Sequence, residues 1–225
     1  MGFDGFPRQT LTFLRGIGRN NNRVWFEAHR GDYERYWLQP ARGFVDAAAP
    51  LLAKVAPLEA DPRVNGSIFR INRDVRFTKD KRPYKDHLDL WFWEGDRSSA
   101  VSGLFLRITS TRLTLGAGSH GFDRDRLRAY RDAVVDPASG PRLVRAVRGV
   151  ERAGFDVAGE QYTTPPRGYA AATPDQERML RHGALWAGSE RPHPPGLHTA
   201  AIVAYCVDEW RKLKPLHRWL VDTLG

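Results

Sequence analysis

The sequence predicts a single α+β domain over residues 1–225, in which an antiparallel sheet of about four to six strands is flanked by N-terminal and C-terminal helices. Three observations support this fold class. Apolar residues in the first third of the chain recur at three- and four-residue spacing, the period of one helix face. The middle third alternates apolar and polar residues, as half-buried strands do. The last third returns largely to helical spacing, and the chain contains no internal repeat or flexible linker.

Capping residues and apolar spacing predict the N-terminal helices. Thr10 caps a short first helix. The asparagines at 20–22 are good N-caps for a second helix over residues 23–37, which is rich in aromatic side chains. Pro40 then opens a third helix that continues to Val55 despite Pro50.

The central strands are predicted from apolar alternation and turn residues. They are expected at 67–73, 88–94, 102–109 and 112–118, and a further strand is expected at 185–187. In the first of them, Phe69 and Ile71 alternate with polar neighbours. The third and fourth form a hairpin that turns at residues 110–111, and Gly116 and Gly118 indicate a bulge or a close backbone approach.

The remaining segments alternate helix and loop. Helices are expected at 123–135, 141–152, 173–182 and 198–224. Asp123 is the expected N-cap of the first of these, and Pro215 is expected to kink or split the last one. Residues 154–174 contain three prolines and several glycines, so they are predicted to form a loop with one short strand.

Composition narrows the classes of protein that this chain can be. At 225 residues it is long enough for one substantial core. A single cysteine, Cys206, excludes an internal disulfide and a multi-cysteine metal site. No apolar run approaches the roughly 20 residues that span a bilayer, and the N-terminus lacks an apolar signal core. We therefore expect a soluble, cytoplasmic protein that does not contact a membrane.

The net charge favours anionic partners. The formal charge is +9 and the isoelectric point is near 10.0, which fits nucleic acid, phosphorylated metabolites, acidic proteins or lipid headgroups. An alternative explanation is genomic, because Arg outnumbers Lys 29 to 6, as in proteins from GC-rich genomes. Three of the six lysines nevertheless lie within seven positions of one another, at 79–85, which indicates that compact ammonium groups serve a purpose there.

These lysines belong to the most informative segment, the block from Ile68 to His87. It carries seven cationic side chains against three anionic ones, so it supplies +4 of the formal charge. The predicted ligand-binding residues are Arg70, Arg73, Arg76, Lys79, Lys81 and Lys85 of this block, together with Asn22 and Trp25. Their chemistry suits a phosphate or carboxylate group. If the site is catalytic, Tyr84 and Asp74 are the candidates for proton transfer.

A structural explanation of the same block stays open. Its charges can form a salt-bridge network that holds a long loop, with Arg73 paired to Asp74 or Glu27 and Asp80 bonded to nearby backbone amides. The aromatic residues near Asn22, Trp25 among them, can likewise be core residues rather than a stacking platform for a ligand.

Two segments resemble a known protein family. Asn21-Asn22-Arg23-Val24-Trp25-Phe26 and the stretch from Arg70 to Lys85 are similar to the signatures of the DUF2461 family of bacterial and fungal proteins. The resemblance covers nearly the whole chain. It implies a single α+β domain, and it supplies no established substrate, cofactor or catalytic residue.

The function predicted from these observations is binding of an anionic, phosphorylated or carboxylated small molecule through the 70–85 block, by a binding protein or an enzyme. Nucleic-acid binding is the alternative, with the arginines of 124–148 extending the basic surface, and an interaction protein with a purely structural block is a third. The seven histidines are scattered and no nucleotide-binding or nucleophile motif occurs, so neither a metal nor a cofactor is predicted. The sequence does not give the oligomeric state.

Overall fold

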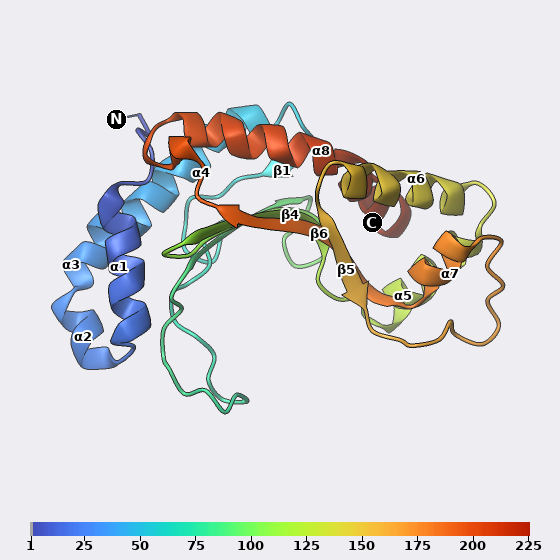
Figure 1. The fold of residues 1–225 in the computed structure, drawn as a ribbon, viewed down its shortest axis with the longest axis horizontal. Coiled ribbons are helices and arrows are strands. Elements are labelled where there is room, and N and C mark those ends of the chain that lie inside the picture. Colours follow the sequence, from blue (N-terminus) through green and yellow to red (C-terminus); the bar gives the residue numbers. More distant parts are fainter. Residues whose placement is uncertain (1) are drawn as a thin grey trace. The chain divides into compact units, whose positions relative to one another are not determined.

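The protein is described by a computed structural model that covers residues 2–225 (Figure 1). The helices are α1 (Arg8–Arg19), α2 (Arg23–Ala28), α3 (Arg30–Asp32), the π-helical η1 (Tyr33–Leu38), α4 (Gln39–Leu52), α5 (Arg124–Val135), α6 (Ser139–Arg152), α7 (Pro174–Leu180), the 3₁₀ turn η2 (Pro195–His198) and α8 (Ala201–Leu224). The strands are β1 (Leu58–Glu59), β2 (Leu88–Glu94), β3 (Gly103–Ile108), β4 (Arg112–Ser119), β5 (Asp156–Glu160) and β6 (His182–Pro192).

The strands form one antiparallel sheet in the order β1-β2-β3-β4-β6-β5. The first four are neighbours in chain order, whereas β6 inserts between β4 and β5. Asp156 of β5 faces Gly188 of β6, and the register shifts between Ala158 and Glu160. The predicted α+β class and the antiparallel sheet of four to six strands are confirmed.

Backbone contacts divide the chain into two compact units. Unit 1 contains residues 1–92, 105–115 and 190–208, and unit 2 contains residues 93–104, 116–189 and 209–225. The extent of a single domain over 1–225 therefore stays a prediction. No helix among residues 2–225 is both long enough and apolar enough to cross a membrane.

The bounds of the N-terminal helices of unit 1 differ from the sequence prediction. α1 begins at Arg8, so Thr10 lies inside this helix and does not cap it. A single helix was expected over 23–37, but α2 ends at Ala28, because the next residue, His29, leaves helical geometry with φ −114°. The His29 ring stacks on Trp25 with centroids 4.0 Å apart, and its Nδ1 lies 2.8 Å from the Trp25 carbonyl oxygen. The Trp25 carbonyl oxygen therefore accepts from both the His29 amide and the His29 ring at the end of α2. The buried faces of α1 and α4, with Ile17 and Phe44, follow the predicted spacing.

The predicted strand at 67–73 is wrong as a regular strand. Only isolated bridges form there, including one between Ile68 and Leu90. The predicted alternation also differs, because Ile68 and Ile71 are buried whereas Phe69 is exposed. The chain leaves the sheet within this segment, so the period of two does not persist.

The other sheet predictions fit more closely. The hairpin of β3 and β4 turns at residues 109–111, as expected. Gly118 has a positive φ of 133°, and a Cβ atom there would lie 2.4 Å from the Leu185 carbonyl oxygen, so the close backbone approach is confirmed. β6 is longer than the three residues predicted for it.

In unit 2, the predicted cap of α5 and the predicted start of α7 are confirmed, whereas α6 begins at Ser139 and not at Pro141. The Asp123 side chain accepts a hydrogen bond from the Arg126 amide at the start of α5. Thr173 accepts one from the Gln176 amide at the start of α7. The C-terminal helix α8 continues through Pro215, so a split at that residue does not occur.

Candidate functional site

The basic block forms a long arm of unit 1, defined here as residues 70–84 (Figure 1). Its two legs run side by side near the base. The Arg73 amide donates to the Pro83 carbonyl oxygen at 2.8 Å, and the Lys85 amide donates to the Ile71 carbonyl oxygen at 2.8 Å. A bridge between Asn72 and Tyr84 completes the pairing. Beyond this base, no regular strand or helix supports the arm.

Ion pairs within the arm support it instead. Asp80 accepts hydrogen bonds from Arg73 at 2.8 Å and from the Arg82 guanidinium at 2.8 Å. Asp74 is held by Arg76 at 2.7 Å. The hydrogen bonds from Arg82, together with the proximity of Arg73, hold the pKa of the Asp80 carboxyl group well below its usual range. Asp80 also accepts the Arg82 amide, as the sequence predicted for a nearby backbone group.

The pairing of Arg73 differs from the sequence prediction. Asp74 or Glu27 was expected to neutralise it, but Asp74 bonds Arg76 and Glu27 bonds Arg30. The reason is the turn at the tip of the arm, which brings Asp80 back toward Arg73 from seven residues along the chain.

The other predicted ligand residues of the arm have different surroundings. Lys81 donates from Nζ to the Val75 carbonyl oxygen at 2.9 Å. Arg70 and Lys79 are exposed. Lys85 lies 4.9 Å from the Phe69 ring centroid and pairs with Asp89 at 3.5 Å. The binding role of these residues stays a prediction.

The first family-like segment clamps the base of the arm. Asn21 Nδ2 donates to the Tyr84 carbonyl oxygen at 2.9 Å, and the Tyr84 amide donates to Asn21 Oδ1 at 3.0 Å. The Tyr84 ring stacks on Phe26 with centroids 4.3 Å apart, so this predicted proton-transfer residue is only 6% exposed. Both segments therefore meet in space, through Asn21 rather than through Asn22.

Asn22 and Trp25 have local roles in this arrangement. The Asn22 side chain caps α2 by accepting the Trp25 amide at 3.0 Å. The Trp25 indole stacks on His29 and lies against Gly16 of α1, where a Cβ atom would be 2.6 Å from the ring. Neither residue is buried in the core, and their predicted contact with a ligand is untested.

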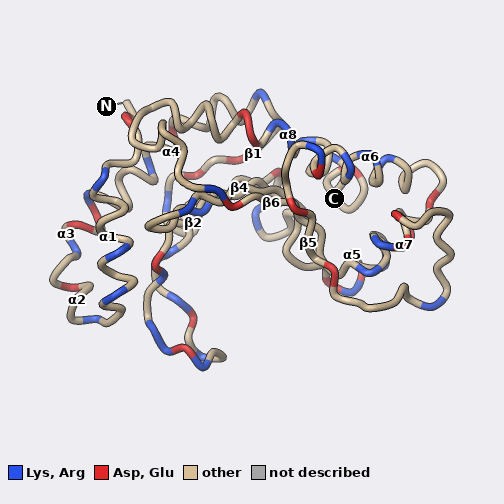
Figure 2. Tube along the Cα trace, in the orientation of Figure 1, with Lys and Arg blue, Asp and Glu red and all other residues tan. Residues whose placement is uncertain are grey.

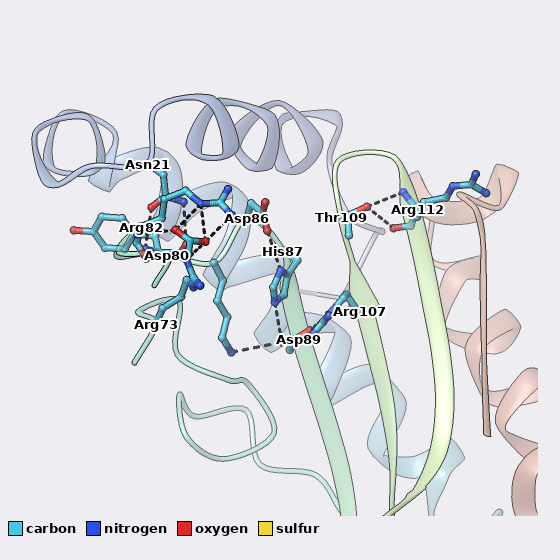
Figure 3. Close-up of polar contacts among 12 residues, drawn as sticks. Asn21, Arg73, Asp80, Arg82, Asp86, His87, Asp89, Arg107, Thr109 and Arg112 are labelled. Carbon is cyan, nitrogen blue, oxygen red and sulfur yellow. Dashed lines mark hydrogen bonds and ion pairs between the residues drawn. The ribbon is translucent and has the colours of Figure 1, made fainter. Parts of the chain in front are cut away.

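Directly after the arm, a cluster of charged side chains surrounds Asp89 (Figure 3). Arg107 of β3 donates to both Asp89 carboxylate oxygens, at 2.7 and 3.1 Å. His87 Nε2 lies 3.2 Å from Asp89 Oδ2, and His87 Nδ1 lies 3.0 Å from Asp86 Oδ1. Because both ring nitrogens face carboxylate oxygens, both hydrogen bonds form together only when the imidazole is protonated. Lys85 completes the cluster.

The carboxyl groups of this cluster remain ionised at neutral pH. Burial raises the pKa of Asp89, but hydrogen bonds from His87 and Arg107 outweigh it and hold the pKa well below the usual range. Burial also raises the pKa of Asp86. The hydrogen bonds that Asp86 accepts, chiefly the one from His87, have the larger effect, so its pKa is lowered overall. Burial lowers the pKa of Lys85, against the opposing effect of Asp89.

A pocket of about 500 Å³ lies in unit 1 beside this cluster. Its walls come from α1, from the turn between β3 and β4, and from single residues after the arm and in β6. It is lined by Leu14, Arg15, Gly18, Arg19, Asp86, Thr109, Ser110, Thr111, Arg112 and Glu190. Such a volume suits a small metabolite. Figure 3 shows the Asp86 wall and the Thr109–Arg112 turn in one view.

The arginines are the most distinctive feature of this pocket. Arg15 and Arg19 are one helical turn apart on α1, and Arg112 starts β4. Among residues 2–225, no acidic side chain forms an ion pair with any of the three guanidinium groups. By contrast, the arginines of the arm at 73, 76 and 82 are paired. The pocket therefore offers cations that have no counter-charge within hydrogen-bonding distance.

Unit 2 contains a separate polar cluster. Ser102 Oγ lies 2.9 Å from His217 Nδ1, and His217 Nε2 lies 2.9 Å from a carboxylate oxygen of Glu94. Arg218 also donates to Glu94, at 2.7 Å. Ser102 is 1% exposed and His217 is fully buried, so these bonds serve to satisfy buried polar groups. Burial lowers the pKa of His217 despite the opposing influence of Glu94.

Comparison with known proteins identifies the family. A family model described as "Conserved hypothetical protein (DUF2461)" matches residues 9–219. The chain belongs to the DUF2461 family. The resemblance inferred from the two motifs is thus confirmed, and the matched DUF2461 region includes both the arm and the pocket. No curated protein and no solved structure matches the chain significantly.

Sequence reasoning on this DUF2461 chain missed the pocket. Arg15 and Arg19 had a detectable signal, since their spacing of four places both on one face of a predicted helix, opposite the buried Leu14 and Ile17. Arg112 had none, because its position beside α1 depends on tertiary structure. Among the described residues, no group of three or more His, Cys, Asp or Glu side chains is arranged to hold a metal ion.

Proposed function

We propose that this DUF2461 protein binds a small anionic molecule, bearing a phosphate or carboxylate group, in the pocket beside α1. The main support is the set of three arginines, Arg15, Arg19 and Arg112, that border the pocket without an acidic partner among the described residues. Guanidinium groups bind phosphate and carboxylate through two parallel hydrogen bonds, which gives them both affinity and geometric selectivity.

The other lining groups define the rest of the ligand. Ser110 and Thr111 provide hydroxyl groups that can donate or accept hydrogen bonds. Asp86 and Glu190 add negative charge, so a ligand with anionic groups at every end would be repelled. The combination fits a compact molecule with one anionic end and a hydroxyl or ammonium group that faces the carboxylates.

Asp86 is also the lining group best placed to orient the polar end of the ligand. Its carboxylate lines the cavity, is ionised at neutral pH and is fixed by His87. A carboxylate in that position can accept a hydrogen bond from a ligand hydroxyl or ammonium group and so orient the ligand. The base of the arm helps to position Asp86. The hydrogen bonds between Asn21 and Tyr84 fix the backbone two residues before Asp86.

A thermal-shift screen tests the proposal. The probes are inorganic phosphate and ribose 5-phosphate, with neutral ribose as the uncharged comparison. Pyrophosphate and citrate, which are anionic at every end, are included as ligands that should bind more weakly. At a ligand concentration of 100 times Kd, binding stabilises the protein by about 2.7 kcal/mol. For a chain of this size that corresponds to a rise in Tm of roughly 5–10 °C.

Two arginines of the same helix provide a matched control. Arg15→Gln removes a pocket cation and should weaken binding about tenfold or more, whereas Arg8→Gln changes an exposed arginine of α1 outside the pocket and should leave affinity unchanged. An equal loss of affinity in both variants would mean that the anion responds to the net charge of the protein, and not to the pocket, and would contradict the proposal. The absence of a shift with every anionic probe would refute the proposal.

A further inference from the structure

The tip of the arm presents an aromatic side chain to solvent. Phe77 is 93% exposed, more than any other large apolar residue described. The Arg76 guanidinium lies 5.4 Å from the centre of its ring, and Asp74 in turn holds that guanidinium. One face of the ring is therefore supported by a fixed cation, while the ring as a whole stays accessible.

The arm that carries Phe77 is cross-linked by its own side chains. Asp80 ties Arg73 on one leg to Arg82 on the other, and Lys81 bonds the Val75 carbonyl across the turn. A loop held in this way loses less conformational freedom on binding than a flexible one. The arm is thus a preorganised element.

The charge of the arm specifies the kind of partner. Residues 70–84 carry six cationic side chains against two anionic ones, a formal charge of +4 (Figure 2). Lys79 is exposed and forms no ion pair with the described residues, and the Arg76 and Arg82 side chains remain more than half exposed despite their pairing. A repeating polyanion would complement such a surface.

We propose that the arm is a contact for single-stranded nucleic acid, with Phe77 stacked on an unpaired base and the arm cations bound to the flanking phosphates. Single strands are bound through this combination of an aromatic stacking platform and basic side chains that follow the backbone. In a duplex the bases are already stacked on one another, so a single ring at the tip of the arm has no unpaired base on which to stack. A membrane surface is less well matched, because one inserted aromatic group is a weak anchor.

This inference is independent of the pocket. It rests on residues of the arm, none of which lines the cavity. The arm cations, for which the sequence predicts a small anion, would instead bind the phosphates of a polymer. Phe77, which the sequence did not indicate, would distinguish a single strand from a duplex.

Fluorescence anisotropy with the full chain tests the proposal. The probe is a labelled mixed-sequence DNA single strand of about 20 nucleotides, compared with the matching duplex. Phe77→Ala should weaken binding about tenfold, and Phe77→Trp should retain it, because stacking on a single base contributes most of this difference. Replacing both Lys79 and Lys81 by Gln should reduce the slope of log affinity against log salt by about 1.4.

Tyr162→Ala is the matched control. Tyr162 is also exposed and lies under an arginine, with Arg131 4.9 Å from its ring, but it is outside the arm. Its replacement should leave the affinity for DNA unchanged. Equal affinity of Phe77→Ala and wild type, or equal affinity for duplex and single strand, would overturn the proposal. So would Phe77-dependent binding to phosphatidylserine vesicles without binding to the oligonucleotide.

Discussion

Replacing Asn21 by Ala should destabilise the protein more than any other change in the Asn20–Asn22 turn. Asn21 is the residue that joins the two family-like segments, through one hydrogen bond to each side of the Tyr84 peptide backbone. Alanine removes both bonds. Because the contact is partly buried, the Tyr84 amide and carbonyl groups would be only incompletely hydrated in the variant.

The magnitude follows from these two bonds. A typical hydrogen bond contributes about 1 kcal/mol net, and a buried group left without a partner costs about 1–3 kcal/mol. With partial solvent access, the expected loss in the free energy of unfolding for Asn21→Ala is about 2–3 kcal/mol. For a chain of this length, that lowers Tm by roughly 5–10 °C.

Urea unfolding, followed by circular dichroism, is the appropriate assay, and the neighbouring asparagines are the controls. Asn20 donates only an exposed bond to the Gly16 carbonyl, so Asn20→Ala should cost about 0.5 kcal/mol or less. Asn22 is the N-cap of α2, so Asn22→Ala should cost about 1 kcal/mol. If Asn21→Ala costs no more than Asn20→Ala, the clamp does not stabilise the base of the arm and the reasoning is refuted.

Three further substitutions test other parts of the structure. Gly118→Ala should destabilise by about 2 kcal/mol or more, because a Cβ atom would lie 2.4 Å from the Leu185 carbonyl oxygen at a positive φ. Gly149→Ala should stabilise α6 by about 0.5–1 kcal/mol, since its Cβ meets nothing within 4 Å; a midpoint below that of wild type would contradict this. Asp89→Asn should cost about 2 kcal/mol by leaving Arg107 unpaired. Because folding lowers the pKa of Asp89, its contribution is present above about pH 4 and is lost as pH falls through the folded-state pKa, so this variant should show a flatter stability profile in acid.

Local signals in the sequence were sufficient for much of the fold. Asp123 was identifiable as a cap, and the helix that starts at Thr173 was identifiable, because an N-cap needs only a short polar side chain and the amides that follow it. The β3–β4 hairpin was similarly predictable, since its strands and its turn are contiguous in the chain.

Features that depend on tertiary contacts could not be predicted in this way. The sequence showed that Arg73 needs a partner, but the choice of Asp80 depends on how the arm turns. Asn21 and Asn22 are identical residues in adjacent positions, and only the fold decides that the first clamps Tyr84 while the second caps α2. The density of charge in the arm led to the prediction of a site there, although Arg73, Arg76 and Arg82 are paired. Arg112, which has no acidic partner among the described residues, lies outside the arm and was not predicted.

The measurement that tests the central claim most directly is a titration of the ¹⁵N-labelled protein with ribose 5-phosphate, which has one anionic end and several hydroxyl groups, followed by amide chemical shifts. Binding in the pocket predicts saturable shifts concentrated in residues 14–19 of α1 and 109–112 of the β3–β4 turn, and their loss in Arg15→Gln. Shifts confined to residues 70–84 would place the anion on the arm instead. Either that result or an unchanged spectrum would contradict the assignment of the pocket as the small-anion site.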